Sequence, residues 1–208
     1  MTFANVEDRR GASVLIAVKQ RERCKTRLAP LLSEALRIEL VRSMLSAVLS
    51  RAASAQTIYQ SVVVSPVRDQ IPADIPVHCD SGESLNEALQ QAHGALRDAG
   101  CGELVVLPAD LPRITAAEID LLVHAGRKNG FAIAPDAAGA GTNALYIGLA
   151  QPFYFQFGPD SYRRHVQQAS RLGLRPQVLH LPGLAFDVDS PADLKLLGDR
   201  RWLAQSCA

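Results

Sequence analysis

The stretch "SVLIAV" at residues 13–18 is a short apolar run rich in β-branched residues, typical of a strand buried on both faces of a sheet. Directly after a polar loop, "SEALRIELVRSMLSAVLSRAAS" at residues 33–54 has the apolar periodicity of a helix, with Ser33 as its expected N-cap. A buried strand followed by such a helix is a βα unit. These two stretches therefore predict an α/β fold.

The alternation of strands and helices continues along the chain. Further strands are expected at "SVVVS" (61–65), "PVHCD" (76–80), "ELVVLP" (103–108), "FAIAPD" (131–136) and "NALYIG" (143–148). Helices are expected at "SLNEALQQAHGALRDAG" (84–100) and "TAAEIDLLVHAGRKNG" (115–130), the second with a capping box from Thr115 to Glu118 and an end at Gly130. This order predicts a doubly wound, mainly parallel sheet, whose ligands bind outside the carboxyl ends of the strands.

The composition is that of an ordinary globular protein. The 208 residues are 48% hydrophobic and 21% charged, and no internal repeat, low-complexity tract or linker divides them. We therefore expect residues 1–208 to form one domain, with residues 1–12 as a flexible N-terminus. The formal net charge of +1 gives no overall field for nucleic acid or a membrane, so neither is an expected partner.

The cysteines and the first residues bear on the cellular location. The four cysteines are far apart in the sequence and form no C-x-x-C pair; they are Cys24, Cys79, Cys101 and Cys207. This spacing argues against a structural zinc site and against a disulfide framework. No apolar run reaches the length of a membrane span, and "MTFANVEDRRGA" lacks the apolar core of a signal peptide. The sequence therefore predicts a cytoplasmic protein.

A strongly basic loop, "KQRERCKTRLAP", follows the first expected strand. Only Glu22 opposes its five cations, which are Lys19, Arg21, Arg23, Lys25 and Arg27. Such a loop between a strand and a helix suits a polyphosphate, because the cations neutralise several oxygens and the helix adds its amide end. The loop contains no glycine, so it is neither a P-loop nor a G-x-G-x-x-G turn. The alternative is a solvated charged loop that binds nothing.

Two short acidic motifs that end in proline predict a metal site. "LPADLP" places Asp110 after a buried strand, and "FDVDSP" places Asp187 and Asp189 two apart on an extended segment, where their side chains project to the same side. If the fold brings these three carboxylates together, they can share a cation. The absence of His and Cys nearby favours Mg²⁺ over zinc.

Each acidic motif also has a purely structural alternative. An aspartate next to proline commonly forms a turn, so Asp110 could have that role alone. In "DSPADL", Asp189 or Ser190 could simply cap a final helix whose first turn contains Pro191.

Two glycine-containing stretches are candidates for binding a small anion. "PDAAGAGTNALYIG" leads from a Gly-rich turn into Thr142, whose hydroxyl and neighbouring amides can hold a phosphate or carboxylate. "FGPDSYRRH" places Gly158, then Pro159 at an expected first helical position, then Ser161 in the first helical turn. The alternatives are a plain hairpin-like loop and a helix start without a ligand.

Taken together, six motifs resemble the guanylyltransferases of coenzyme F420 biosynthesis, the CofC/FbiD family: "AVKQRERCKTRLAP", "DSGESLNEAL", "LPADLP", "PDAAGAGTNAL", "FGPDSYRRH" and "FDVDSPADL". The resemblance extends from Val14 to about Leu197. It implies a Rossmann-like three-layer nucleotidyltransferase fold of the GT-A type. It also implies transfer of the guanylyl group of GTP to a three-carbon phospho-acid, which is 2-phospho-L-lactate, phosphoenolpyruvate or 3-phospho-D-glycerate, with release of diphosphate.

The resemblance also implies roles for individual residues. The Mg²⁺ ligands would be Asp110, Asp187 and Asp189, and the acceptor acid would be held by Thr142, Gly158 and Ser161. GTP would be bound by Lys19, Arg23, Lys25, Arg27, Leu85 and Asn86, with Lys19, Lys25 and Asp110 as the catalytic residues. Cys24 and Ser84 depart from the family pattern, where a small residue and glycine are usual. The product would be handed to the next transferase of the F420 pathway.

The chemistry accounts for the residue types independently. GTP and a phospho-acid are both anions, so their approach is opposed mainly by repulsion and cations are the expected catalysts. The acceptor phosphate, with a second pKa of about 6, is already ionised at neutral pH, so no general base is needed. His165 and His180 are accordingly expected to make structural hydrogen bonds. The alternative functions are a GT-A glycosyltransferase that uses a nucleotide sugar and a non-catalytic nucleotide-binding module.

Overall fold

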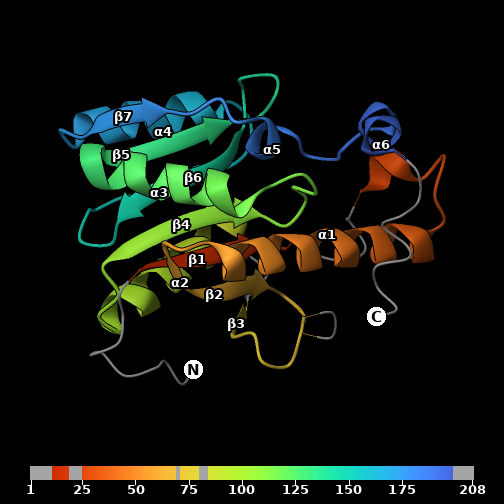
Figure 1. Cartoon of the computed structure of the whole chain (residues 1–208), viewed down its shortest axis with the longest axis horizontal. Helices are drawn as coiled ribbons and strands as arrows, with labels where there is room; N and C mark the ends of the chain where they lie inside the picture. Colours follow the sequence, from red (N-terminus) through yellow and green to blue (C-terminus); the bar gives the residue numbers. More distant parts are fainter. Residues whose placement is uncertain (1–10, 19–24, 69–70, 80–83, 199–208) are drawn as a thin grey trace.

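The computed structural model describes residues 11–18, 25–68, 71–79 and 84–198. Its centre is a seven-stranded sheet in the order β3-β2-β1-β4-β6-β5-β7 (Figure 1). The strands are β1 (Ala12–Ala17), β2 (Ile58–Ser65), β3 (Val77–Cys79), β4 (Glu103–Pro108), β5 (Gly130–Pro135), β6 (Thr142–Gly148) and β7 (Arg175–Val178). Only β6 runs antiparallel to its neighbours in this sheet. The predicted mainly parallel α/β fold is confirmed.

Helices cover both faces of the sheet and give three layers (Figure 1). The long helices are α1 (Glu34–Ser54), α2 (Leu85–Asp98), α3 (Ala116–Asn129) and α4 (Ser161–Arg171), and the short ones are η3 (Thr26–Leu28), α5 (Pro182–Ala185) and α6 (Pro191–Leu197). One apolar core lies between the sheet and α1 with α3, and a second lies between the sheet and α2 with α4. Burial on both faces explains why the central strands are almost entirely apolar.

Local signals placed most helix ends correctly. The Ser33 hydroxyl accepts a hydrogen bond from the Leu36 amide, and Thr115 forms the expected capping box with Glu118. Ser190, rather than Asp189, caps α6. The structural alternative for this motif therefore holds for Ser190, and Asp189 is not the capping residue.

The predicted start of α4 was wrong by two residues. Pro159 lies before the helix, and Asp160 adopts a left-handed conformation with φ of 55°, so that Ser161 is the first helical residue. The sequence also gave no indication of β7 and α5. With the sequence "RPQV", β7 alternates between exposed and half-buried residues at the sheet edge, so it lacks the apolar run of a central strand.

The domain prediction remains a prediction at both ends of the chain. Residues 1–10 and 199–208 lie outside the described residues. Within the predicted flexible segment 1–12, Ala12 is the fully buried first residue of β1. None of the helices in the described ranges combines the length and the apolar character that a membrane crossing requires.

The sheet brings four chain segments to one edge. Ala17 and Pro108 are paired at the ends of β1 and β4, so Val18 and Ala109, which follow them, lie at the same edge. Because β6 is antiparallel to β4, its first residue, Thr142, lies at that same edge. The backbone amide of Val188 donates to the carbonyl of Asp110 at 3.3 Å, which attaches the second acidic motif to the first.

Packing between α3 and the sheet predicts opposite effects for two helical glycines. A Cβ at Gly126 would lie 2.0 Å from the buried ring of Tyr146, whereas a Cβ at Gly94 in α2 would meet no atom within 4 Å. We expect Gly126→Ala to lower the free energy of unfolding by about 1–3 kcal/mol through overpacking. Gly94→Ala should raise it by roughly 0.5–1 kcal/mol, because alanine favours helix. Urea unfolding of the two variants measures both, and equal effects would contradict the packing argument.

Candidate active site

A pocket of about 290 Å³ opens at the carboxyl ends of β1 and β4. Its polar lining comes from the basic loop and both acidic motifs, and includes Lys25, Arg27, Asp110 and Asp189. Leu85, at the start of α2, contributes to the apolar part of the lining. The pocket therefore joins residues from all three predicted nucleotide or metal motifs, at the edge where doubly wound sheets bind ligands.

Lys25 is the charge centre of this pocket. Its Nζ lies 2.5 Å from Oδ2 of Asp110 and 2.6 Å from Oδ1 of Asp189. The side chain is only 8% exposed, and the residue has a left-handed backbone with φ of 53°, which turns the chain into η3. Burial alone would lower the pKa of the Lys25 ammonium, but the charges and hydrogen bonds of the two aspartates raise it above its usual value. Lys25 is therefore a cation at neutral pH.

Asp187, the third predicted acid, is held by β6. Its Oδ1 accepts a hydrogen bond from Nδ2 of Asn143 at 3.2 Å, and the same Nδ2 donates to the carbonyl of Leu184 at 2.9 Å. Burial raises the pKa of the Asp187 carboxyl; the Asn143 hydrogen bond opposes this, and the nearby charges of Asp110 and Asp189 raise it further. The contributions of Asp110 and Asp189 to this pKa indicate that the three carboxylates repel one another, and a bound cation would relieve that repulsion.

These oxygens fit a hard divalent cation chemically. Two of the three acids already hold an ammonium group between them, which shows that the position attracts positive charge. Within the described ranges, no three His, Cys, Asp or Glu side chains are grouped closely enough to hold an ion together. The three-carboxylate Mg²⁺ site therefore stays a prediction, and Lys25 would have to release one or both carboxylates for it to form.

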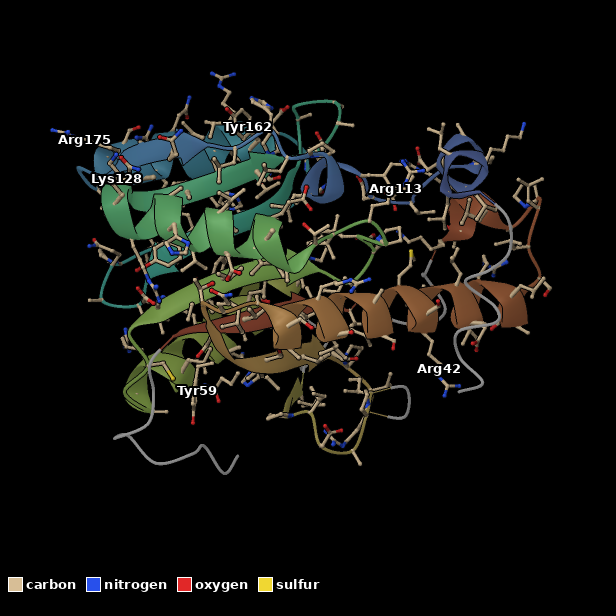
Figure 2. The ribbon with its side chains drawn as sticks, viewed as in Figure 1. Arg42, Tyr59, Arg113, Lys128, Tyr162 and Arg175 are labelled. Carbon is tan, nitrogen blue, oxygen red and sulfur yellow. The ribbon has the colours of Figure 1, made fainter. Side chains whose placement is uncertain are left out.

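Arg113 fastens the second acidic motif over the first. Its guanidinium lies 4.1 Å from the ring centroid of Phe186, and it also donates a hydrogen bond to the carbonyl of Leu196 in α6. Figure 2 shows Arg113 between the loop that follows β4 and α6. Together with the Val188 amide bond to Asp110, this contact fixes where Asp187 and Asp189 lie.

The predicted acceptor residues gather around the start of α4. The amide of Tyr162 donates to the carbonyl of Ala140 at 3.2 Å, which joins the helix start to the turn between β5 and β6 (Figure 2). Ser161 is 2% exposed. Gly158, three residues earlier, has a φ of 121°. Thr142 is also buried, and its Oγ1 lies 3.0 Å from Nδ1 of His165. The structure thus brings Thr142 and the predicted α4 residues to one place.

The turn between β5 and β6 is held from inside by Asp136. Its carboxylate accepts hydrogen bonds from the amides of Ala140 and Gly141, both at 2.9 Å. A Cβ at position 141 would lie 2.5 Å from the carboxylate oxygen, so the second glycine of the turn is sterically required. The turn is therefore hairpin-like, as the structural alternative had it, and it leads directly into Thr142 at the start of β6.

The remaining predicted GTP-binding residues are placed unevenly. Lys19 and Arg23 lie outside the described residues. Arg27 is exposed at the pocket, whereas the Asn86 side chain donates to the carbonyl of Phe157 at 3.1 Å and accepts from its amide at 2.7 Å. Asn86 therefore anchors the segment before α4, and its role beside the nucleoside stays a prediction.

Sequence reasoning assigned no role in the site to two residues that the structure places there. Asn143 positions Asp187, and His165 contacts Thr142 from α4. The register between β5 and β6 shifts beside them, where Ala134 pairs with Ala144 but Pro135 pairs with Thr142, leaving Asn143 without a paired residue in β5. A polar pair at the start of an apolar strand was the available signal, since bulges often direct side chains near active sites.

Comparison with known proteins gives a consistent result. Residues 12–198 match the family model described as "Guanylyl transferase CofC like". A phosphoenolpyruvate guanylyltransferase of Chloroflexus aurantiacus is 37% identical over 186 residues, which cover 85% of this chain and 89% of the relative. Another from Sphaerobacter thermophilus is 36% identical over 187 residues, covering 88% and 90%.

Solved structures support the fold. A putative nucleotide-diphospho-sugar transferase from Desulfovibrio desulfuricans G20 aligns with a TM-score of 0.73 at 19% identity, covering 89% of this chain and 85% of that chain. A 4-diphosphocytidyl-2C-methyl-D-erythritol synthase aligns with a TM-score of 0.61 at 16% identity, covering 93% and 99%. At these identities the likeness concerns the three-layer fold alone.

Proposed function

We propose, given that this chain belongs to the CofC-like guanylyl transferase family, that it transfers the guanylyl group of GTP to the phosphate of a small three-carbon phospho-acid and releases diphosphate. The names of the relatives favour phosphoenolpyruvate as the acceptor, with 2-phospho-L-lactate and 3-phospho-D-glycerate as the other candidates. The reaction would supply coenzyme F420 biosynthesis, and the product would pass to the next transferase of that pathway.

The observation that carries this proposal is the Lys25 pocket at the strand ends. A buried cation faces two carboxylates there, and exposed Arg27 lines the same pocket. In the reaction, an oxygen of the acceptor phosphate attacks the α-phosphorus of GTP, and the bond to the bridging oxygen of the diphosphate breaks. The leaving diphosphate gains negative charge, which Lys25 and Arg27 can stabilise from the basic loop.

The carboxylates of the pocket have a complementary role. Asp110, Asp187 and Asp189 would hold Mg²⁺, which supplies charge neutralisation on the phosphate oxygens. With the ion bound, the negative charge of the three carboxylates would be balanced and would no longer repel the anionic substrates. Asn143 keeps Asp187 oriented, and Arg113 keeps the second acidic motif in place.

The acceptor acid would bind at the start of α4, beside Thr142. The Ser161 hydroxyl has no hydrogen-bond partner within the part of the chain that the structure describes, although the residue is buried. A hydroxyl in this position can donate to a phosphate or carboxylate oxygen. Because the acceptor phosphate is ionised at neutral pH, its attack requires positioning rather than a general base.

Product analysis tests the reaction directly. The protein is incubated with GTP, Mg²⁺ and each of the three acids in turn, and the products are identified by mass spectrometry. We expect diphosphate and a compound in which GMP is joined to the acid through a diphosphate bond, with phosphoenolpyruvate the best acceptor. Turnover of a nucleotide sugar without release of diphosphate from GTP would instead support a glycosyltransferase. GTP binding without any metal-dependent turnover would indicate a non-catalytic module.

Ser161→Ala should raise the KM for the acceptor acid and leave the KM for GTP almost unchanged. Loss of one hydrogen bond to a charged group lowers kcat/KM by roughly tenfold to a hundredfold. The matched control is Ser170→Ala, which removes an exposed hydroxyl from the same helix, where it donates to the Val166 carbonyl. A lower melting temperature with both KM values intact would mean that Ser161 only stabilises its helix turn. A defect specific for GTP would reverse the placement of the two substrates.

A further inference from the structure

A chain of hydrogen bonds leads from the backbone before α4 to the predicted acceptor residue. The amide of Gln156 donates to Nε2 of His165 at 2.9 Å. On the other side of the ring, Nδ1 lies 3.0 Å from Oγ1 of Thr142. His165 is completely buried, and the rings of Phe153 and Phe157 lie 5.7 and 4.9 Å from it between centroids. The imidazole therefore joins the two polar groups in apolar surroundings.

The backbone amide fixes the tautomer of this ring. An N–H group can only donate, so Nε2 must be the unprotonated acceptor nitrogen. A neutral imidazole then carries its proton on Nδ1, which donates to the Thr142 hydroxyl oxygen. Burial, together with the neighbouring charge of Arg164, lowers the pKa of His165 to about 4, so the ring is neutral at neutral pH.

The tautomer decides the polarity of the Thr142 hydroxyl. Because its oxygen accepts from His165, the hydroxyl proton must be donated elsewhere. Within the described residues Thr142 has no second side-chain hydrogen bond, and the residue lies against α4 at the end of the sheet where β1 and β4 finish and the Lys25 pocket opens. An anion can accept a hydrogen bond from this hydroxyl. If the hydroxyl instead donated to the imidazole, its oxygen lone pairs would face the anion and repel it.

We propose that His165 is a positioning residue, which holds the Thr142 hydroxyl as a hydrogen-bond donor toward the anionic acceptor acid. The proposal rests on the proposed function for the identity of that acid. This role goes beyond structural support, because a histidine that only supported the fold would not determine whether the Thr142 hydroxyl donates or accepts a hydrogen bond. His165 itself contacts neither substrate and exchanges no proton during the reaction.

Two substitutions separate the two hydrogen bonds of the ring. In His165→Asn the amide Nδ2 occupies roughly the place of Nδ1 and keeps the donor to Thr142. In His165→Gln the Oε1 occupies roughly the place of Nε2 and keeps only the acceptor for the Gln156 amide. We expect His165→Gln to raise the acceptor KM about tenfold or more, and His165→Asn to keep it within about threefold of wild type, with the GTP KM unchanged in both. Equal increases in the two variants would overturn the proposal.

A double variant tests whether His165 acts through Thr142. Thr142→Val removes the hydroxyl at nearly constant shape and should raise the acceptor KM by itself. In Thr142→Val combined with His165→Gln, the second change should add almost nothing, because the hydroxyl on which it acts is absent. If the increases in acceptor KM of the two single variants multiply in the double variant, His165 supports the site independently of Thr142, and the proposal is overturned. Calorimetric titration with phosphoenolpyruvate measures the same coupling without turnover.

The tautomer can be read independently of activity. Among the five histidines of the ¹⁵N-histidine-labelled protein, the signal of His165 is identified by its loss in His165→Gln. At neutral pH we expect a protonated Nδ1 and an unprotonated Nε2, and the opposite tautomer or a cationic ring would overturn the proposal. If the tautomer and the binding coupling hold but no acid is guanylylated, the proposed function fails alone. If wild type turns over and His165→Gln matches it, the positioning role fails alone.

Discussion

Asp110→Asn should nearly abolish guanylyl transfer while the protein stays folded. Asparagine has the same shape but no charge, so it is a poor ligand for Mg²⁺ and a weaker partner for Lys25. Asp110 lines the pocket directly behind β4, and its backbone carbonyl accepts the Val188 amide, which the substitution leaves intact. Loss of several kcal/mol of charge stabilisation in the transition state corresponds to a decrease in kcat/KM of roughly 10²–10³-fold or more.

Initial rates at saturating and limiting Mg²⁺, with the melting temperature, measure this effect. The matched control is Asp98→Asn, the same chemical change at an exposed acid near the end of α2, whose ion-pair partner among the described residues is the adjacent Arg97. The control should retain wild-type rates. Near-normal turnover of Asp110→Asn at limiting Mg²⁺ would remove Asp110 from the metal site and return it to the role of a turn residue.

Much of the fold was predictable because its signals are local. The apolar runs of β1 and β4 indicate strands buried on both faces, and the caps at Ser33 and Thr115 fix helix starts within the chain's own neighbourhood. The start of α4 was not predictable from "GPD", because Asp160 takes a left-handed conformation that proline at a first helical position would not suggest. The β7 strand exists only through its pairing with β5, which is a tertiary contact.

Some residues of the candidate site could likewise be located from local sequence, and others could not. Its carboxylates could be located from sequence, because Asp110 follows a buried strand and Asp187 and Asp189 flank the core residue Val188 on an extended segment. Their partner Lys25 could not be located from sequence, because it lies 85 and 164 residues away from the two acids that it contacts. Charge alone does not distinguish Lys25 from the other cations of its loop; of the two that the structure describes, Lys25 and Arg27, it is Lys25 that lies between the acids.

Asn143 and His165 illustrate a second limit. Each is a polar residue whose role depends on the direction in which its side chain points, and the register shift at β6 sets that direction for Asn143. For His165 the decisive contact is an amide nine residues earlier in the chain. Sequence reasoning treated this histidine as structural, which is the usual role for a buried imidazole and describes only one of its two hydrogen bonds.

Lys25→Met should reduce turnover by on the order of a hundredfold with every acceptor alike, because in the proposed reaction the lost charge would face the triphosphate rather than the acid. Methionine keeps the length of the side chain and its packing in the pocket. The KM for GTP should rise, while the KM for the acid should change little. The matched control is Lys128→Met near the end of α3, an exposed lysine at the opposite end of the sheet (Figure 2).

Stability measurements on the same variant test the position of Lys25 between the two acids. Without the ammonium, Asp110 and Asp189 lose their shared partner and repel each other, which we expect to cost about 1–3 kcal/mol because Asp189 is partly solvated. The melting temperature should therefore fall in the presence of a chelator. Mg²⁺ should then raise it more in Lys25→Met than in wild type, since the ion no longer competes with an ammonium for the same oxygens. An equal rise in melting temperature with Mg²⁺ in both proteins would show that Lys25 does not occupy the metal site. A loss of turnover confined to one acceptor acid would instead place Lys25 beside the acceptor.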